Sequence, residues 1–185
     1  ALVSPRAPRI QDLGTRYLRL RLLGRGGMGT VFLVRDSYLK KDLALKILHA
    51  SPLGPEEMQE AQREFVLLSR LEHPGLARAH DFGYLRGRPY FTSEFIPGEP
   101  LSERSPLESG PELLRLAVDL AESLAFLHQS GLLHLDVKAS NVILTRSGAR
   151  SGGLTRAVLI DFGLVRRGAP LPAGKRIRGS LPYMA

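Results

Sequence analysis

The sequence predicts an α+β fold in two lobes, in which a five-stranded antiparallel sheet with one helix precedes a mostly helical second lobe. Three observations carry this prediction: short β-prone runs fill the first hundred residues, one helical segment interrupts them, and a long amphipathic segment follows at 111–130. A chain of 185 residues buries roughly 70% of the surface that its unfolded form exposes. That is enough for two small lobes that share an interface.

The first three strands are expected to form a meander. Residues 17–24 (YLRLRLLG) alternate apolar and basic side chains, the period of a half-buried strand, and they run directly into a glycine cluster. Two further β-prone runs at 31–36 and 43–48 are separated by a polar link of hairpin length. A tight turn therefore joins the first two strands, and a hairpin joins the second to the third.

One helix and two more strands complete the first lobe. Pro55 can occupy the first turn of a helix, where its missing N–H costs nothing. Apolar residues then recur at helical spacing until His73 and Pro74, and they are Met58, Ala61, Phe65 and Leu68. Two β-prone runs follow near 79–85 and 89–96.

The second lobe opens with a helix from Pro111 to Ser130, closed by Gly131 in the left-handed cap position. Its apolar positions are Leu113, Leu116, Ala117, Leu120, Leu124 and Leu127. Short strands are expected at 141–144 and 157–160, joined by a flexible Ser/Gly/Arg loop. Residues 98–110 are expected to be a linker with at most one helical turn.

Charge and composition exclude several classes of protein. The 26 basic and 18 acidic residues give a net charge of +8, with +6 in residues 1–40, −5 in 41–144 and +7 in 145–185. Because neither basic end interleaves aromatic residues, nucleic-acid binding is disfavoured but stays open as a rival. The absence of cysteine excludes disulfides, cysteine zinc sites and thiol nucleophiles. We expect no membrane segment within this chain, because no apolar run approaches the required 18 or so residues.

The first chemical motif is the glycine cluster, which spans residues 24–31 (GRGGMGTV) between two strands. Glycines allow the backbone to approach phosphate groups closely. By itself the motif is weak, and a hairpin with a glycine turn explains it about equally well. A dinucleotide fingerprint is disfavoured because a strand, not a helix, follows.

Lys46 is the second candidate, because it lies inside the apolar run LALKIL on the same strand face as Ala44 and Leu48. A buried ammonium requires a partner, although a lysine that extends to solvent is the plain alternative. Glu64 offers that partner from the helix, and Glu60, one turn earlier, competes with it. A Lys–Glu pair beside a glycine loop would hold the cation against the phosphates of a nucleotide.

The decisive segment runs from His134 to Asn141 (HLDVKASN) and is followed by Asp161-Phe162-Gly163. Asp136 can place a carboxylate at an attacking hydroxyl, and Lys138 a cation at the transferred phosphoryl group. Asn141 and Asp161 can supply oxygen ligands to Mg²⁺. Either motif could be a capped turn, but both in this order behind the glycine loop make coincidence improbable.

With these motifs the sequence resembles the protein kinase family, specifically the bacterial eukaryotic-like Ser/Thr kinases, from about Tyr17 to Ala185. The resemblance implies an N-terminal extension at 1–16, an N-lobe at 17–96 and a partial C-lobe at 97–185. It implies that Lys46 contacts the α- and β-phosphates and pairs with Glu64, that Asp136 is the catalytic base and that Lys138 steadies the γ-phosphate.

The resemblance also implies a nucleotide site and two metal ligands. Glycines 24, 26 and 29 would cover the phosphates, and Asn141 and Asp161 would bind Mg²⁺. The adenine base would meet the backbone of Glu94 and Ile96, beside Ser93 as a small gatekeeper. The residues expected to enclose the base, together with the loop glycines, are Leu23, Val31, Ala44, Ile143, Gly24, Gly26 and Gly29.

The function implied is transfer of the γ-phosphoryl group of ATP, with Mg²⁺, to Ser/Thr hydroxyls of a protein substrate, by a kinase domain in the cytoplasm. Lys138 is typical of Ser/Thr rather than Tyr kinases. The main alternative is a nucleotide-binding pseudokinase or scaffold. A small-molecule phosphotransferase shares the Asp and Asn of the catalytic loop but usually lacks Lys138.

Three departures from the family pattern stand out. Leu135 replaces the arginine that usually binds an activation-loop phosphate, so we expect no requirement for phosphorylation there. The link from Asn141 to Asp161 is long, which predicts an insertion at 146–154. The chain starts without Met and stops at Ala185, where the family continues for several helices. Ser180 occupies the place of a threonine that helps to position the catalytic aspartate.

Overall fold

A computed structural model describes residues 15–27, 29–49, 55–85, 87–104, 110–146, 155–161 and 166–167. The chain divides into two compact units. The first unit comprises residues 1–70 and 78–95, and the second comprises residues 71–77 and 96–185. The short segment 71–77 thus belongs with the later part of the chain, although both of its neighbours belong to the first unit.

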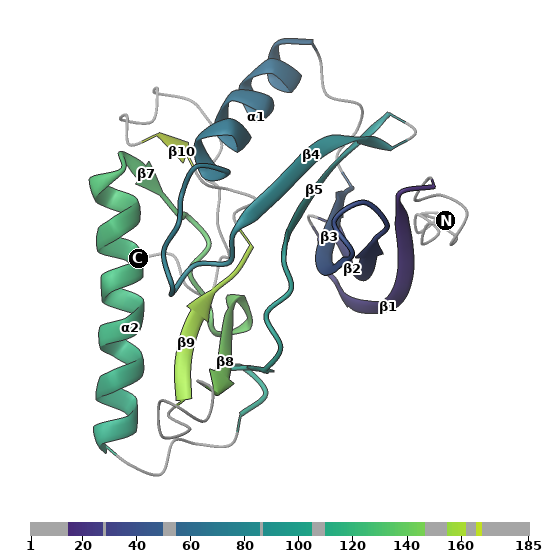
Figure 1. Ribbon diagram of the computed structural model, residues 1–185. Helices are drawn as coiled ribbons and strands as arrows, with labels where there is room; N and C mark the ends of the chain where they lie inside the picture. The colour runs from purple at the N-terminus through teal and green to yellow at the C-terminus, as the bar shows by residue number, and fades with distance from the viewer. Residues whose placement is uncertain are drawn as a thin grey trace, which may run out of the picture. The chain divides into compact units, whose positions relative to one another are not determined.

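The first unit is built on the predicted five-stranded antiparallel sheet (Figure 1). Its strands are β1 (Tyr17–Arg25), β2 (Gly29–Asp36), β3 (Lys41–Leu48), β4 (Ala79–Leu85) and β5 (Arg88–Glu94). Their order is β1-β2-β3-β5-β4, so the expected meander of the first three strands is confirmed. The fifth strand ends at Glu94, two residues earlier than the sequence suggested.

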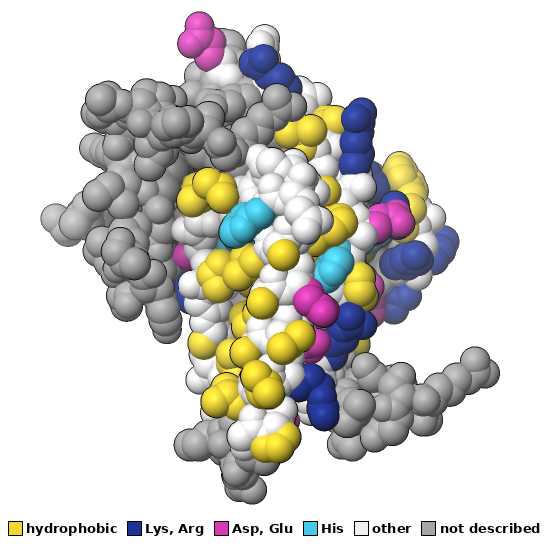
Figure 2. All heavy atoms as spheres, turned by 90° about the vertical axis from the view of Figure 1, so that its left-hand side faces the viewer, with side chains coloured by type: hydrophobic (Ala, Val, Ile, Leu, Met, Phe, Trp, Pro, Cys, Tyr) yellow, Lys and Arg dark blue, Asp and Glu magenta, His cyan; other side chains and the backbone are white. Residues whose placement is uncertain are grey.

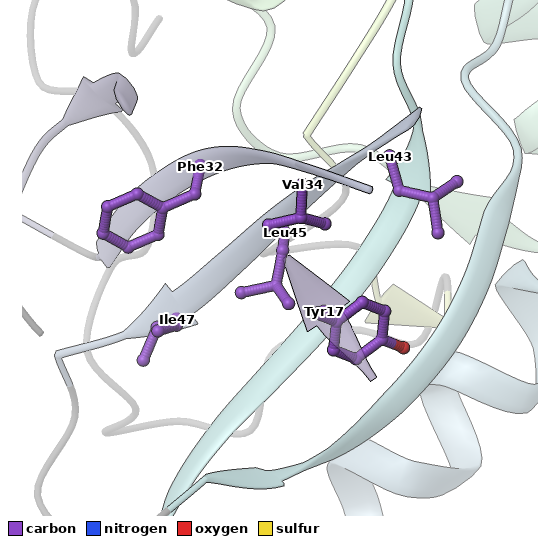
Figure 3. Close-up of a cluster of buried hydrophobic side chains, with 6 residues drawn as sticks. All are labelled: Tyr17, Phe32, Val34, Leu43, Leu45 and Ile47. Carbon is purple, nitrogen blue, oxygen red and sulfur yellow. The ribbon is translucent and has the colours of Figure 1, made fainter. Parts of the chain in front are cut away.

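One face of this sheet carries the core of the first unit (Figure 3). Alternate residues of β3 point to the same side, so Leu43, Leu45 and Ile47 lie together and are at most 2% exposed. Phe32 and Val34 of β2 join them and are fully buried. Tyr17 closes the cluster with its ring edge against the ring of Tyr90, at a centroid distance of 5.8 Å.

The helix α1 (Pro55–Leu68) lies on the opposite face of the sheet. Phe65 of α1 stacks on Phe82 of β4, with ring centroids 5.6 Å apart. Phe82 is directly opposite Phe91, and Phe91 is directly opposite Lys46, so the three side chains share one face. The register of three strands therefore places α1 on the side to which Lys46 points.

The second unit combines the long helix α2 (Gly110–Gln129) with short strands (Figure 1). Strands β6 (Glu99–Pro100), β8 (Val142–Arg146) and β9 (Thr155–Leu159) form a sheet in the order β6-β8-β9. Strands β7 (Leu132–Leu133) and β10 (Arg166–Arg167) form an antiparallel pair. Gly131 adopts φ = 72°, the left-handed conformation expected at the end of the long helix.

Only part of the apolar face expected for α2 is buried. Leu116 and Leu127 are buried, but Leu113 is 56% exposed. Leu114 and Val118, which the periodicity did not single out, are 66% and 46% exposed. Figure 2 shows hydrophobic side chains gathered along this helix. No helix in the described ranges is both long and apolar enough to cross a membrane.

The segment 71–77 is anchored to α2 and β9 within the second unit. Leu159 donates its backbone N–H to the carbonyl of Gly75, and Ala77 donates to the carbonyl of Leu159. The hydroxyl of the fully buried Ser123 on α2 donates to the Gly75 carbonyl at 3.2 Å and to the Asp119 carbonyl at 2.8 Å. The ring of His73 stacks on Phe126 at 4.9 Å.

Candidate active site

The glycine turn joins β1 to β2, and its backbone N–H at Gly26 donates to the carbonyl of Gly29 at 3.0 Å. Gly29 is opposite Leu48 in the register, and a side chain at this position would bring its Cβ to 2.6 Å from the carbonyl oxygen of Ile47. Only glycine therefore allows β2 and β3 to approach this closely. At Gly24 and Gly26 an added Cβ would meet no atom within 4 Å.

Lys46 is only 7% exposed on β3, and its Nζ lies 5.7 Å from the centroid of the Phe91 ring. A buried ammonium needs charged or polar partners. The helix that carries Glu64 lies on the same face of the sheet, as shown by the stacking of Phe65 on Phe82. The side chains of Glu64 and Glu60 lie outside the described residues, so their pairing with Lys46 stays a prediction.

Four residues expected near an adenine base lie on four different strands of the first unit, β1, β2, β3 and β5. Val31 is directly opposite Lys46 and Ala44 is two residues before it, so all three share a sheet face. Ser93, 9% exposed, is opposite Ala44 on the same face. Leu23 lies where the register of β1 shifts between Leu22 and Gly24.

The remaining nucleotide candidates lie at the boundary between the units or in the second one. Glu94 ends β5 and donates its backbone N–H to the carbonyl of Arg78 at 2.8 Å. Ile96 is the first residue of the longer part of the second unit. Ile143 of β8, also in the second unit, is half-buried and lies opposite Val158.

The second unit gathers Asp136, Lys138 and Asn141 into one hydrogen-bonded group. The Asp136 carboxylate is buried, and its Oδ2 accepts from Lys138 Nζ at 2.8 Å and from Asn141 Nδ2 at 3.0 Å. Asn141 Nδ2 also donates to the backbone carbonyl of Asp136 at 2.8 Å. Because the amide nitrogen serves Asp136, the amide oxygen is the atom of Asn141 suited to bind a cation.

His134 supports this group through the backbone, a role that the sequence did not reveal. Its Nδ1 accepts the backbone N–H of Asp136 at 3.3 Å, and its side chain is 2% exposed. Burial lowers the pKa of His134, and a hydrogen bond to the backbone of Ile160 opposes this only in part. A neutral ring has the lone pair that the Asp136 N–H requires. A histidine two residues before the aspartate in an apolar context was the available signal.

Two residues of this region adopt the left-handed conformation that favours glycine. Leu135 has φ = 59° and Asp161 has φ = 66°. Such strain costs about 1–3 kcal/mol and is held in place by surrounding contacts. One of these contacts runs from the N–H of Ile160 to the carbonyl of Asn141 at 2.8 Å, which brings the backbone before Asp161 beside Asn141.

Backbone pairing links the two chain segments that carry these groups. Leu133 of β7, next to His134, lies opposite Arg166, and Leu132 lies opposite Arg167. The arrangement offers a carboxylate beside an ammonium and a carboxamide whose oxygen can bind a cation, which suits proton acceptance and cation binding. Three sequence predictions fall outside the described residues: Phe162 and Gly163, Ser180, and the insertion, of which only Arg146 belongs to a described strand.

Comparison with known proteins agrees with this arrangement. The protein kinase domain family matches residues 17–185. The serine/threonine-protein kinase pkn2 of Myxococcus xanthus is 37% identical over 164 residues, which cover 86% of this chain and 19% of that protein. The serine/threonine-protein kinase PknA of Mycobacterium tuberculosis is 33% identical over 193 aligned residues, which cover 97% of this chain and 43% of that protein.

Solved structures show the same fold. The kinase domain of Mycobacterium tuberculosis PknI matches with a TM-score of 0.65 and 33% identity, over 85% of this chain and 63% of that domain. A double mutant of the same kinase domain gives a TM-score of 0.69 at 32% identity. The chain thus spans less than half the length of these curated relatives and under two thirds of the solved domain. The match over residues 17–185 and the shared fold show that this chain belongs to the protein kinase family.

Proposed function

We propose that the protein transfers the γ-phosphoryl group of ATP to Ser/Thr hydroxyls of a protein substrate. The observation that carries this proposal is the hydrogen-bonded group of Asp136, Lys138 and Asn141 in the second unit. Its three members supply a proton acceptor, a cation and a metal-binding oxygen within one short loop. The names of the relatives, which are Ser/Thr kinases, support the choice of acceptor.

In the proposed mechanism Asp136 orients the substrate hydroxyl and accepts its proton as the oxygen attacks phosphorus. The bond from the γ-phosphorus to the bridging oxygen of ADP breaks, and the electron pair leaves with ADP. Lys138, which forms an ion pair with Asp136, would also neutralise the transferred group. His134 and the second hydrogen bond from Asn141 keep the carboxylate in place.

Mg²⁺ fits the donor set of the second unit. The ion usually takes one or two protein oxygens and completes its shell with phosphate and water. Asn141 would offer its amide oxygen and Asp161 its carboxylate, and the bound ion would supply charge neutralisation for the phosphates. Within the described residues no cluster of three His, Cys, Asp or Glu ligands competes with this pair.

The first unit would hold the nucleotide. We propose that Gly24, Gly26 and Gly29 cover the phosphates. Lys46, paired with Glu64, would contact the α- and β-phosphates. The apolar side chains named above would enclose the base, together with the backbone of Glu94 and Ile96. The domain boundaries 1–16, 17–96 and 97–185 belong to the same proposal. Because ATP is the donor, we place the catalytic domain in the cytoplasm.

The test measures γ-phosphoryl transfer and nucleotide binding separately. The full-length protein is expected to bind Mg-ATP and to phosphorylate Ser/Thr residues of a generic basic protein. Lys46→Met is expected to weaken Mg-ATP binding about tenfold or more, since hydrogen bonds to charged groups contribute roughly 1.5–3 kcal/mol. Binding without transfer by the wild type would instead identify a pseudokinase, and equal affinity of both proteins would remove the role given to Lys46.

A further inference from the structure

One histidine is linked both to the glycine turn and to the strand that follows it. His49 directly follows the last residue of β3, and its Nε2 lies 2.7 Å from Oγ1 of Thr30. The backbone of Gly27 acts on the same ring as a hydrogen-bond acceptor, in the direction that raises the pKa of His49. Gly27 lies in the turn that precedes β2, and Thr30 is the second residue of β2. A single imidazole therefore connects the turn, the strand after it and the neighbouring strand.

The two groups that His49 contacts differ in burial. Thr30 is 1% exposed and lies opposite Ile47 in the register of β2 and β3, so it is a fixed point of the sheet. Gly27 is exposed, has no side chain, and an added Cβ would meet nothing within 4 Å. The ring thus attaches an open glycine backbone to a rigid strand pair.

The protonation state of His49 suits both contacts. Burial lowers the pKa of His49, and the positive charges of Arg25 on β1 and Arg88 on β5 lower it further, while the bond to Gly27 acts in the opposite direction. The neutral imidazole that results has one N–H and one lone pair. It can therefore donate to a backbone carbonyl and accept a threonine hydroxyl at the same time.

We propose that His49 is a positioning residue that holds the glycine turn in the conformation that receives the phosphate groups of ATP. This inference rests on the function proposed above. A glycine-rich turn has many accessible conformations, and ordering it upon binding reduces affinity. Restraint by His49 reduces the entropy that the turn loses when ATP binds. His49 should therefore increase affinity for the phosphate groups, and should not affect binding of the base or the rate of proton transfer.

The first experiment compares two ligands that differ only in phosphate. His49→Ala is expected to weaken Mg-ATP binding and raise its KM about 5- to 20-fold, the effect of losing one or two hydrogen bonds, with kcat changed less than about twofold. Affinity for adenosine, which has no phosphate, is expected to stay unchanged. Calorimetry and steady-state kinetics on the full-length protein give these values. The control is His128→Ala, an exposed position at the end of α2.

A double-mutant cycle separates positioning from general damage. Thr30→Val removes the hydroxyl and keeps the β-branched shape, and its effect on Mg-ATP affinity is expected to be less than additive with that of His49→Ala. His49→Gln, which keeps a donor and an acceptor, is expected to restore part of the affinity. Unchanged Mg-ATP binding in His49→Ala, equal losses for ATP and adenosine, or full additivity would each overturn the proposal. Failure of the wild type to transfer phosphate would refute the kinase function alone, since the comparison of ligands needs only binding.

Discussion

The two units hold their candidate functional residues by different physical means. In the first unit, strand register places Val31, Ala44 and Lys46 on one sheet face, and the main-chain hydrogen bonds of the ladder fix their spacing. In the second unit, side-chain hydrogen bonds hold Asp136 and Asn141 in a loop with left-handed residues. The spacing of these three positions in the first unit therefore depends on main-chain bonds, whereas in the second unit a substitution of Asp136 or Asn141 removes a hydrogen-bond partner from the other.

The different ways in which the two units hold their residues suit them to different tasks, nucleotide binding in the first unit and phosphoryl transfer in the second. Backbone register tolerates substitution, so the first unit suits a nucleotide that is recognised through main-chain groups and apolar contacts. A hydrogen-bonded network tolerates little, because a buried polar group that loses its partner costs about 1–3 kcal/mol. The second unit suits a reaction in which a proton and a phosphoryl group must follow defined paths.

The largest effect is expected from Asp136→Asn, which tests whether the second unit serves chemistry. Removal of a general base typically lowers the rate about 10²- to 10⁴-fold, and Mg-ATP affinity should persist because the first unit is intact. Steady-state kinetics and calorimetry on the full-length protein measure the two quantities. The exposed position Glu122 on α2 provides the control, as Glu122→Gln. Transfer by Asp136→Asn at the wild-type rate would contradict the assignment.

The next largest effect is expected on stability, where a buried leucine in the core of the first unit is compared with an exposed leucine on α2. Leu45→Ala should lower the unfolding free energy of the 185-residue chain by about 2–5 kcal/mol, because Leu45 is 1% exposed. Leu114→Ala should change it by at most about 0.5 kcal/mol, because Leu114 is 66% exposed. Urea denaturation measures both. A comparable cost for the two leucines would show that the surface of α2 is covered.

Within the glycine turn, two positions should differ although their residues are the same. Gly29→Ala should lower the unfolding free energy by about 1–3 kcal/mol, because the new Cβ would force β2 away from the carbonyl of Ile47. Gly26→Ala should stay within about 0.5 kcal/mol, since nothing lies within 4 Å of its Cβ. Thermal unfolding ranks the two variants, and the reverse order would refute the close approach of β2 and β3.

The smallest effect concerns pH and asks whether both units respond to acid. Burial lowers the pKa of His80 in the first unit and of His134 in the second, below the ordinary value of 6.5. Because the unfolded chain then binds more protons than the folded one, stability should be complete above about pH 6.5 and fall as the pH decreases below it. Urea denaturation at about pH 7.5 and about pH 5.5 measures the loss.

Variants can assign this acid sensitivity to individual rings. His80→Asn and His134→Asn should each lose less stability between about pH 7.5 and about pH 5.5 than the wild type does, because a ring that must remain neutral has been removed. The exposed position 128 again provides the control, as His128→Asn. If both variants kept the wild-type pH dependence of stability, a lowered pKa of His80 or His134 would not be the cause of the acid sensitivity.

Most of the helices and strands could be predicted because they are long enough for the spacing of their apolar residues to be recognised. The five strands of the first unit and both helices occupy the expected segments, with ends that shift by a few residues. Strands β6, β7 and β10 were missed, since two residues carry no periodicity. The apolar periodicity of α2 located the helix but did not show which of its leucines are buried, since Leu113 is exposed whereas Leu116 and Leu127 are buried.

The candidate site shows a similar limit. The order and spacing of Asp136, Lys138 and Asn141 predicted their gathering, since residues so close in sequence meet in one loop. The supporting role of His134 could not be predicted, because it depends on burial and on the direction of one backbone N–H. The link from His49 to Thr30 was also missed, since only the register of β2 and β3 brings residues 19 positions apart into contact.

The packing of Gly75 against Ser123 has a consequence for how this chain can evolve. A Cβ at position 75 would lie 2.1 Å from the hydroxyl oxygen of Ser123, an overlap that requires one of the two to move. The two positions, 48 residues apart, therefore cannot vary independently. Relatives with a side chain at position 75 should carry alanine or glycine at position 123, and Gly75→Ala in this chain should be rescued by Ser123→Ala. The contact between Gly75 and Ser123 therefore limits which pairs of residues can occupy these two positions in related sequences.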